Sequence, residues 1–226
     1  MPLLRHGGPA AYELFLKTWG LVPAAYFGDA APPAAGWWPF LTNMFLHGGV
    51  LHLGFNMWTL YIFGPAVEDR FGSGRFVALY LLFGLAASLA HAAANADSAV
   101  PAIGASGAIA GVTGAYMRLF PRSLVVVLVP ILFYPLFFEL PAAAFAAFWF
   151  ATQFVQGVFS LFLPANVGGI AWWAHIGGFV AGLLVASIYG GGGRRHRALQ
   201  CDEGRFGCRP DGARARRPWH REGYGP

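Results

Sequence analysis

Five long apolar runs constrain the fold of this chain more than any other feature. An α-helix needs about 20 residues to cross the hydrocarbon of a bilayer, and each run comes close to that length. Hydrophobic residues make up 57% of the 226 residues and charged residues 11%, which excludes an ordinary soluble domain and a disordered chain. The sequence therefore predicts an all-α, polytopic membrane protein with about five transmembrane helices. The predicted spans are 50–67, 76–94, 103–119, 141–162 and 171–189.

The placement of arginine predicts how these spans are oriented. Short loops rich in Lys and Arg stay in the cytoplasm. The segments 94–101 and 163–170 contain no Lys or Arg and are therefore expected outside. Nine arginines follow residue 193, so the C-terminus is expected in the cytoplasm. The other arginines that mark the cytoplasmic side are Arg70, Arg75, Arg118 and Arg122.

A sixth apolar run, 124–138, is short and contains Pro130 and Pro135. If this run crossed the bilayer, the later spans would invert and the arginine-rich tail would lie outside. We therefore expect it to fold along or into the cytoplasmic interface. The chain then divides into an extracytoplasmic, loop-like N-terminal segment (1–46), a transmembrane core (47–190) and a disordered basic cytoplasmic tail (191–226).

Four polar side chains are expected at one depth in the outer half of the bundle. Ser106 and His175 each lie a few residues below the outer end of a span, and at 1.5 Å per residue His52 and Asn56 reach the same layer. Taken singly, a serine beside glycines often serves only helix packing, and a pair such as His52 and Asn56 often serves only hydrogen bonding between helices. Independent packing residues have no reason to share a depth, so the coincidence favours a nucleophile with its base.

Four short motifs surround these residues. They are HGGVLHLGFN (47–56), VEDRFGSG (67–74), GASG (104–107) and AHIGG (174–178). Their combination, order and spacing resemble the rhomboid intramembrane serine proteases of the bacterial type, over roughly residues 37–189. The resemblance implies that Ser106 is the nucleophile and His175 the general base. It also implies an oxyanion hole made by His52, Asn56 and the backbone N–H of Ser106.

The surroundings of Ser106 predict how the site is built. Asp97 and Glu139 lie in or beside loops, so a Ser-His dyad is expected rather than a triad. Pro101 and Gly104 predict non-helical backbone before Ser106, which a membrane tolerates beside protein or a water-filled cavity. Small residues four apart let helices approach closely. The structural glycines are Gly104, Gly107, Gly111, Gly178 and Gly182.

The chain departs from the rhomboid pattern in three places. Most rhomboids begin with an additional membrane helix, and no apolar run of sufficient length precedes Trp37. We expect this form to be less stable and less active than one extended upstream. A start assigned too late in the coding sequence would explain the missing helix. Pro39 stands where an arginine is common. Ala110, one turn after Ser106, stands where many relatives carry an aromatic that packs on the catalytic histidine.

The leading interpretation is a protease in a bacterial inner (plasma) membrane that cleaves membrane proteins in or near their transmembrane segments. A rhomboid-like pseudoprotease, which binds membrane clients without cleaving them, is the alternative; the retention of Ser106 and His175 argues against it. A secondary transporter is disfavoured because the chain has no paired halves.

The expected partners are transmembrane protein substrates and membrane lipid. No cofactor is expected, and no metal, because His47 and His52 lack the H-E-x-x-H pattern of zinc proteases. Nucleic acid is not an expected partner, since a charged, solvated tail accounts for the clustered arginines.

Overall fold

Apolar helices build the core of the protein. The computed structural model describes residues 8–27, 34–131, 134–162 and 170–189. Within these ranges, four helices are long and apolar enough to cross a membrane. The prediction of a helical membrane bundle is therefore confirmed. These helices are α4 (Val50–Phe71), α5 (Ser73–Ala94), α7 (Ala142–Ser160) and α8 (Trp172–Tyr189).

The fifth predicted span differs from the expectation. Residues 103–119 were expected to form a full span, but helix α6 (Ser106–Leu119) has 14 residues and is therefore only about 21 Å long. The backbone before it is not helical, because Gly104 has a φ of +131°, which an L side chain rarely adopts. Nine α6 residues are buried, so its apolar character reflects packing against protein as well as membrane.

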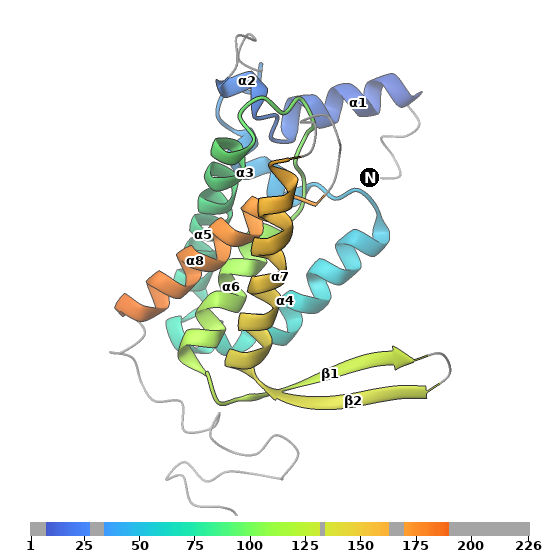
Figure 1. Ribbon diagram of the computed structural model, residues 1–226. Coiled ribbons are helices and arrows are strands. Elements are labelled where there is room, and N and C mark those ends of the chain that lie inside the picture. Colours follow the sequence, from blue (N-terminus) through green and yellow to red (C-terminus); the bar gives the residue numbers. More distant parts are fainter. Residues whose placement is uncertain (1–7, 28–33, 132–133, 163–169, 190–226) are drawn as a thin grey trace, which may run out of the picture. The chain divides into compact units, whose positions relative to one another are not determined.

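Helix α6 packs against α4, α5, α7 and α8 (Figure 1). Glycines allow a particularly close crossing with α8. A Cβ added to Gly178 would run into the carbonyl oxygen of Gly107, and one added to Gly182 would run into that of Gly111. The two backbones are thus in direct contact one turn apart, and Ser106 lies next to the first of these contacts.

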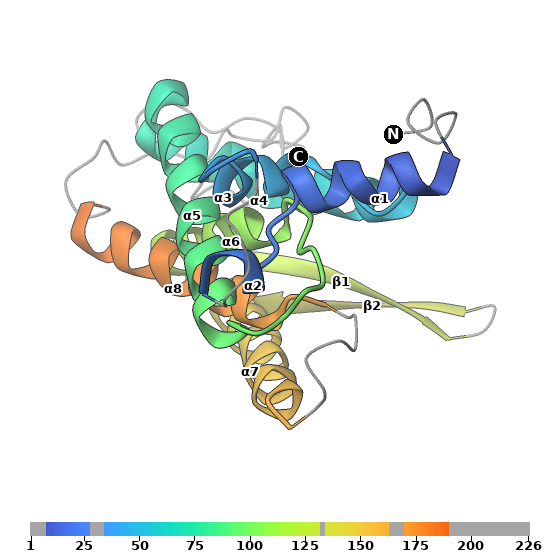
Figure 2. The ribbon, with the colours of Figure 1, turned by 90° about the horizontal axis from the view of Figure 1, so that it is seen from above.

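The run 124–138 forms a β-hairpin with the residues that follow it. Strands β1 (Leu124–Ile131) and β2 (Tyr134–Pro141) pair antiparallel, with Leu124 opposite Pro141. Consecutive β-branched valines in β1 favour a strand over a helix, which the all-α prediction did not include. Figure 1 and Figure 2 both show the hairpin projecting away from the helices. Its expected position at the cytoplasmic interface stays a prediction.

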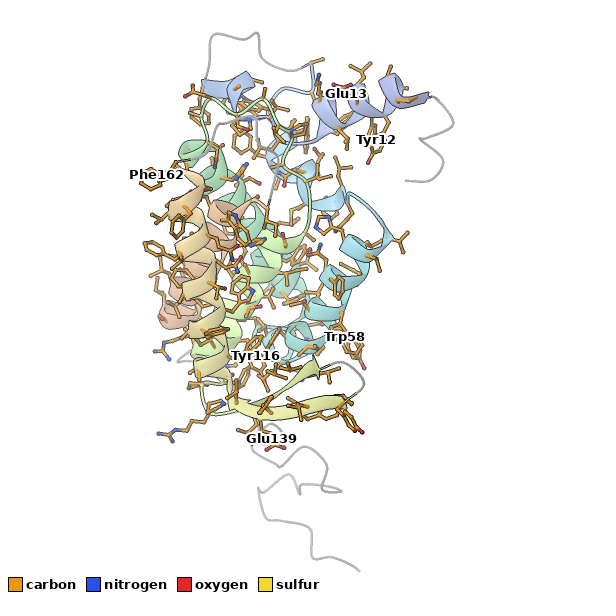
Figure 3. All side chains as sticks on the ribbon, turned by 45° about the vertical axis from the view of Figure 1, so that its right-hand side comes forward. Tyr12, Glu13, Trp58, Tyr116, Glu139 and Phe162 are labelled. Carbon is orange, nitrogen blue, oxygen red and sulfur yellow. The ribbon has the colours of Figure 1, made fainter. Side chains whose placement is uncertain are left out.

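The two ends of the helical bundle hold different clusters. One cluster joins the C-terminal half of α4 to the ends of α6 and α8, where Arg118 Nε donates to Ser187 Oγ at 3.0 Å. A second cluster lies at the far end of α5 and includes Leu21 and Ala92. In Figure 3 the labelled side chain of Glu13 lies at one end of the helices and that of Glu139 at the other. The orientation of these ends in the membrane stays a prediction.

The N-terminal segment contains helices rather than only loop. Helix α1 (Gly8–Trp19) carries an ion pair of 2.7 Å between Glu13 and Lys17, one turn apart, which favours a helix where 1–46 was expected to be loop-like. Short helices follow at α2 (Ala24–Phe27), α3 (Pro39–Thr42) and the 3-10 turn η2 (Asn43–Phe45). The tail prediction, 191–226, falls outside the described residues.

The N-terminal segment also holds the loop that leads into α6. Leu21 and Ala102 exchange backbone hydrogen bonds of 3.0 and 2.8 Å, forming an isolated antiparallel bridge. The carbonyl of Asn43 accepts the Gly104 N–H at 2.9 Å. The backbone before Ser106 is therefore fixed on both sides, which sets the position of the serine.

Candidate active site

Ser106 and His175 meet across the α6–α8 crossing. Ser106 is the first residue of α6, and His175 lies in the first turn of α8. Ser106 Oγ and His175 Nε2 are 2.7 Å apart, within hydrogen-bonding distance. His175 is only 8% exposed, so little water competes for this contact. The geometry suits transfer of a proton from the hydroxyl to the ring.

The second ring nitrogen of His175 has a partner that the sequence analysis missed. His175 Nδ1 lies 2.6 Å from Oε1 of Gln153, a buried residue of α7. An amide oxygen can only accept, so Nδ1 carries the proton and Nε2 keeps a lone pair for the Ser106 hydroxyl. Gln153 is a polar residue inside the apolar run 141–162, and this burial of a polar group in an apolar span was the available signal, as it was for Ser106.

Two tryptophans surround the His175 ring. The Trp149 ring lies 5.8 Å from it, centroid to centroid, and is tilted by 35°. The Trp172 ring approaches edge-on at 6.2 Å. Ala110 is buried in a cluster against which Trp149 packs. The side chain at position 110 of α6 is small, and the aromatic ring that reaches the histidine comes from α7 instead.

His52 faces the loop just before Ser106. The N–H of Gly48 donates to His52 Nδ1 at 3.3 Å, which leaves the ring proton on Nε2. A Cβ built on Gly104 would lie 2.9 Å from His52 Nε2 and 3.7 Å from Ser106 Oγ. The Nε2–H is thus a donor close to the serine. Beside it, burial lowers the pKa of His47, whose ring packs edge-on against His52 at 5.2 Å.

Asn56 lies one turn along α4 from His52 and is buried. Its amide donates one hydrogen to the backbone carbonyl of His52 at 2.9 Å. This hydrogen bond lies within α4 rather than reaching Ser106. A carboxamide has two N–H groups, so the second is left for another acceptor. The structure thus joins Ser106 to His175 directly and holds Asn56 on the helix that carries His52.

Polar side chains also line a cavity next to Ser106. Its wall includes Asn43, Ser88 and His91, and Asn43 donates to the Ser88 hydroxyl at 2.8 Å. These groups give water partners beside the nucleophile. Among the described residues, no group of three or more His, Cys, Asp or Glu side chains could hold a metal ion.

Comparison with known proteins identifies relatives for most of the core. The sequence profile of the Rhomboid domain matches residues 34–191. "Rhomboid protease GluP" of Bacillus subtilis is 46% identical over 81 residues, covering 36% of this chain and 15% of that protein. "Putative rhomboid protease YdcA" of the same organism is 36% identical over 81 residues, covering 36% of this chain and 40% of that protein.

A longer match reaches a eukaryotic relative. "Rhomboid protein 1, mitochondrial" of Saccharomyces cerevisiae is 31% identical over 146 residues, or 63% of this chain and 39% of that protein. In all three comparisons the chain spans less than half the length of the relative.

Proposed function

Since this chain belongs to the rhomboid family and is an integral membrane protein, we propose that it is an intramembrane serine protease. It hydrolyses peptide bonds in or near transmembrane segments of membrane proteins, with Ser106 and His175 as a catalytic dyad. The observation that carries this proposal is the 2.7 Å contact between Ser106 Oγ and His175 Nε2, with Nδ1 held by an acceptor.

The geometry supports a two-step acyl transfer. Ser106 Oγ attacks the peptide carbonyl carbon while its proton moves to His175 Nε2, and the imidazolium then gives this proton to the leaving amine. Water afterwards hydrolyses the acyl-enzyme, with His175 again taking and returning a proton. The cavity beside Ser106 gives that water room and polar partners.

Negative charge on the substrate oxygen needs donors near Ser106. The Ser106 N–H opens helix α6, where the first four N–H groups have no intrahelical acceptor and the helix dipole favours an anion. His52 Nε2–H and the second N–H of Asn56 complete the proposed oxyanion hole. These donors stabilise the transition state because their positions are fixed before the charge develops.

The membrane in which the protein lies, and its orientation there, are also proposed. We propose the inner (plasma) membrane of a bacterium, and the distribution of arginines supports a C-terminus in the cytoplasm. The proposed partners are transmembrane protein substrates and lipid.

Reconstitution into liposomes with a single-span reporter substrate tests this function. We expect cleavage of the reporter in or near its transmembrane helix, with the new ends located by mass spectrometry. Co-purification of intact reporter with the folded protein, without any cleavage, would favour the pseudoprotease alternative and overturn the proposal.

Asn56→Ala is expected to lower kcat by about ten- to a thousandfold with little change in KM, because the lost donor acts mainly in the transition state. Steady-state cleavage kinetics measure both constants. Asn95→Ala is the matched control, since Asn95 makes the same hydrogen bond to the carbonyl four residues earlier, that of His91, at 2.9 Å. A purely structural Asn56 would show a lowered melting temperature and an unchanged kcat per folded molecule.

A further inference from the structure

Gln153 stands at the centre of a hydrogen-bond chain that ends on the nucleophile. The chain runs from the carbonyl of Trp149 through Thr152, Gln153 and His175 to Ser106. Three of these residues come from α7, which contributes no residue to the proposed dyad or oxyanion hole. We propose that Gln153 is a positioning residue that holds His175 in the one tautomer able to accept the Ser106 proton. The inference rests on the proposed function.

The orientation of the Gln153 amide follows from its neighbour. The Thr152 hydroxyl has one hydrogen, which it donates to the Trp149 carbonyl at 2.6 Å. Thr152 Oγ1 can therefore only accept from Gln153, and its partner at 3.2 Å is Gln153 Nε2. With the NH2 group directed at Thr152, the Oε1 atom is the one that faces His175. The opposite orientation would lose this bond and place a donor against Nδ1.

Burial makes this orientation decisive for the imidazole. Gln153 is 6% exposed and His175 is 8% exposed, so an unmet donor or acceptor in this pair has little water to replace its partner. In neutral imidazole one nitrogen carries the proton and the other accepts. Because Oε1 requires a donor, the proton stays on Nδ1, and Nε2 is free to accept from Ser106 at 2.7 Å.

The same contact persists through the reaction. When the Ser106 proton reaches Nε2, the ring becomes an imidazolium whose Nδ1–H still donates to Oε1, now as a charge-assisted bond. No proton leaves Nδ1, so Gln153 orients the ring without taking part in the transfer. An amide thus fills the orienting role that a carboxylate fills in a triad.

Gln153→Met tests the role because it keeps the length and unbranched shape of the side chain and removes the amide oxygen. We expect kcat to fall by about ten- to a hundredfold, as for loss of other partners that orient a functional histidine, with KM little changed. Gln153→Glu keeps an acceptor at the same place and should recover most of the lost kcat. Gln156→Met is the matched control, since Gln156 lies on the same helix and is exposed.

Substitutions at Thr152 provide a second test of the same role. Thr152→Val removes the hydroxyl that fixes the amide and should lower kcat less than Gln153→Met does. Thr152→Ser keeps the hydroxyl and should restore it. A kcat that falls equally in Thr152→Val and Thr152→Ser would contradict the orienting chain.

A spectroscopic readout separates this inference from the proposed function. In protein labelled with ¹⁵N-histidine, the His175 signals, identified by their loss in His175→Ala, should report a protonated Nδ1 and an unprotonated Nε2. Gln153→Met should shift them toward the other tautomer, and this holds whether or not the protein cleaves a substrate. Unchanged His175 signals, or parental kcat in Gln153→Met while cleavage still requires Ser106, would overturn the role of Gln153 alone.

Discussion

Ser106→Ala and His175→Ala are each expected to reduce cleavage of a transmembrane reporter by about 10⁴-fold or more, because neither dyad member works without the other. The double variant should be little worse than either single one, since paired catalytic residues act as a unit. Time courses with purified protein in liposomes measure the loss. Ser73→Ala, at the exposed start of α5, is the control for a serine replacement and should keep the parental rate.

Folding must be followed in the same samples. Ser106→Ala should keep expression and melting temperature close to those of the parent, because it removes one hydrogen bond without changing the helix crossing. His175→Ala should still fold but with a lower melting temperature, because it removes the hydrogen bonds of both ring nitrogens, so its cleavage is compared per folded molecule. Cleavage near the parental rate in folded Ser106→Ala would contradict the mechanism.

Gly178→Ala is expected to destabilise the protein strongly, although it adds only one methyl group. The added Cβ would overlap the carbonyl oxygen of Gly107, and backbone cannot move aside as a flexible side chain can. Overpacking typically costs about 1–3 kcal/mol, and a collision with backbone at a helix crossing belongs at the upper end of that range or beyond. Thermal unfolding in detergent measures the effect. Activity should fall too, because the same crossing positions His175 against Ser106.

Two further alanine variants make this prediction specific. Gly182→Ala should behave like Gly178→Ala, because its Cβ would meet the carbonyl oxygen of Gly111. Gly54→Ala, in helix α4, has nothing within 4 Å of the added Cβ and should be neutral or slightly stabilising. Equal melting temperatures for all three variants would show that the α6–α8 crossing does not depend on glycine.

The sequence predicted that the helices of Ser106 and His175 meet at the site, but it did not predict how short helix α6 is. Matching the depths of Ser106 and His175 required only span positions and the 1.5 Å rise of a helix. The short α6 was harder to foresee, because the apolar run 103–119 continues through non-helical backbone, and hydropathy does not distinguish the two. The left-handed φ of Gly104 is the local cause, and the glycine itself was the available signal.

Two other features depend on contacts that a single sequence does not display. The run 124–138 is apolar throughout, so no alternation of polar and apolar residues marked it as a strand; only its valines favoured one. Gln153 was not predicted, because a group that orients the histidine of a Ser-His pair is usually expected to be a carboxylate. A neutral amide that accepts a hydrogen bond meets the same need within an apolar helix.

Labelling with a fluorophosphonate, followed by peptide mass spectrometry, tests the central claim most directly. The probe phosphonylates the oxygen of an activated serine and releases fluoride, so it reports nucleophilicity without requiring the natural substrate. The account predicts an adduct on Ser106 in the parent protein, absent from Ser106→Ala and strongly reduced in His175→Ala. Folded parent protein that carries no adduct on Ser106, or labelling at the parental rate in His175→Ala, would contradict it.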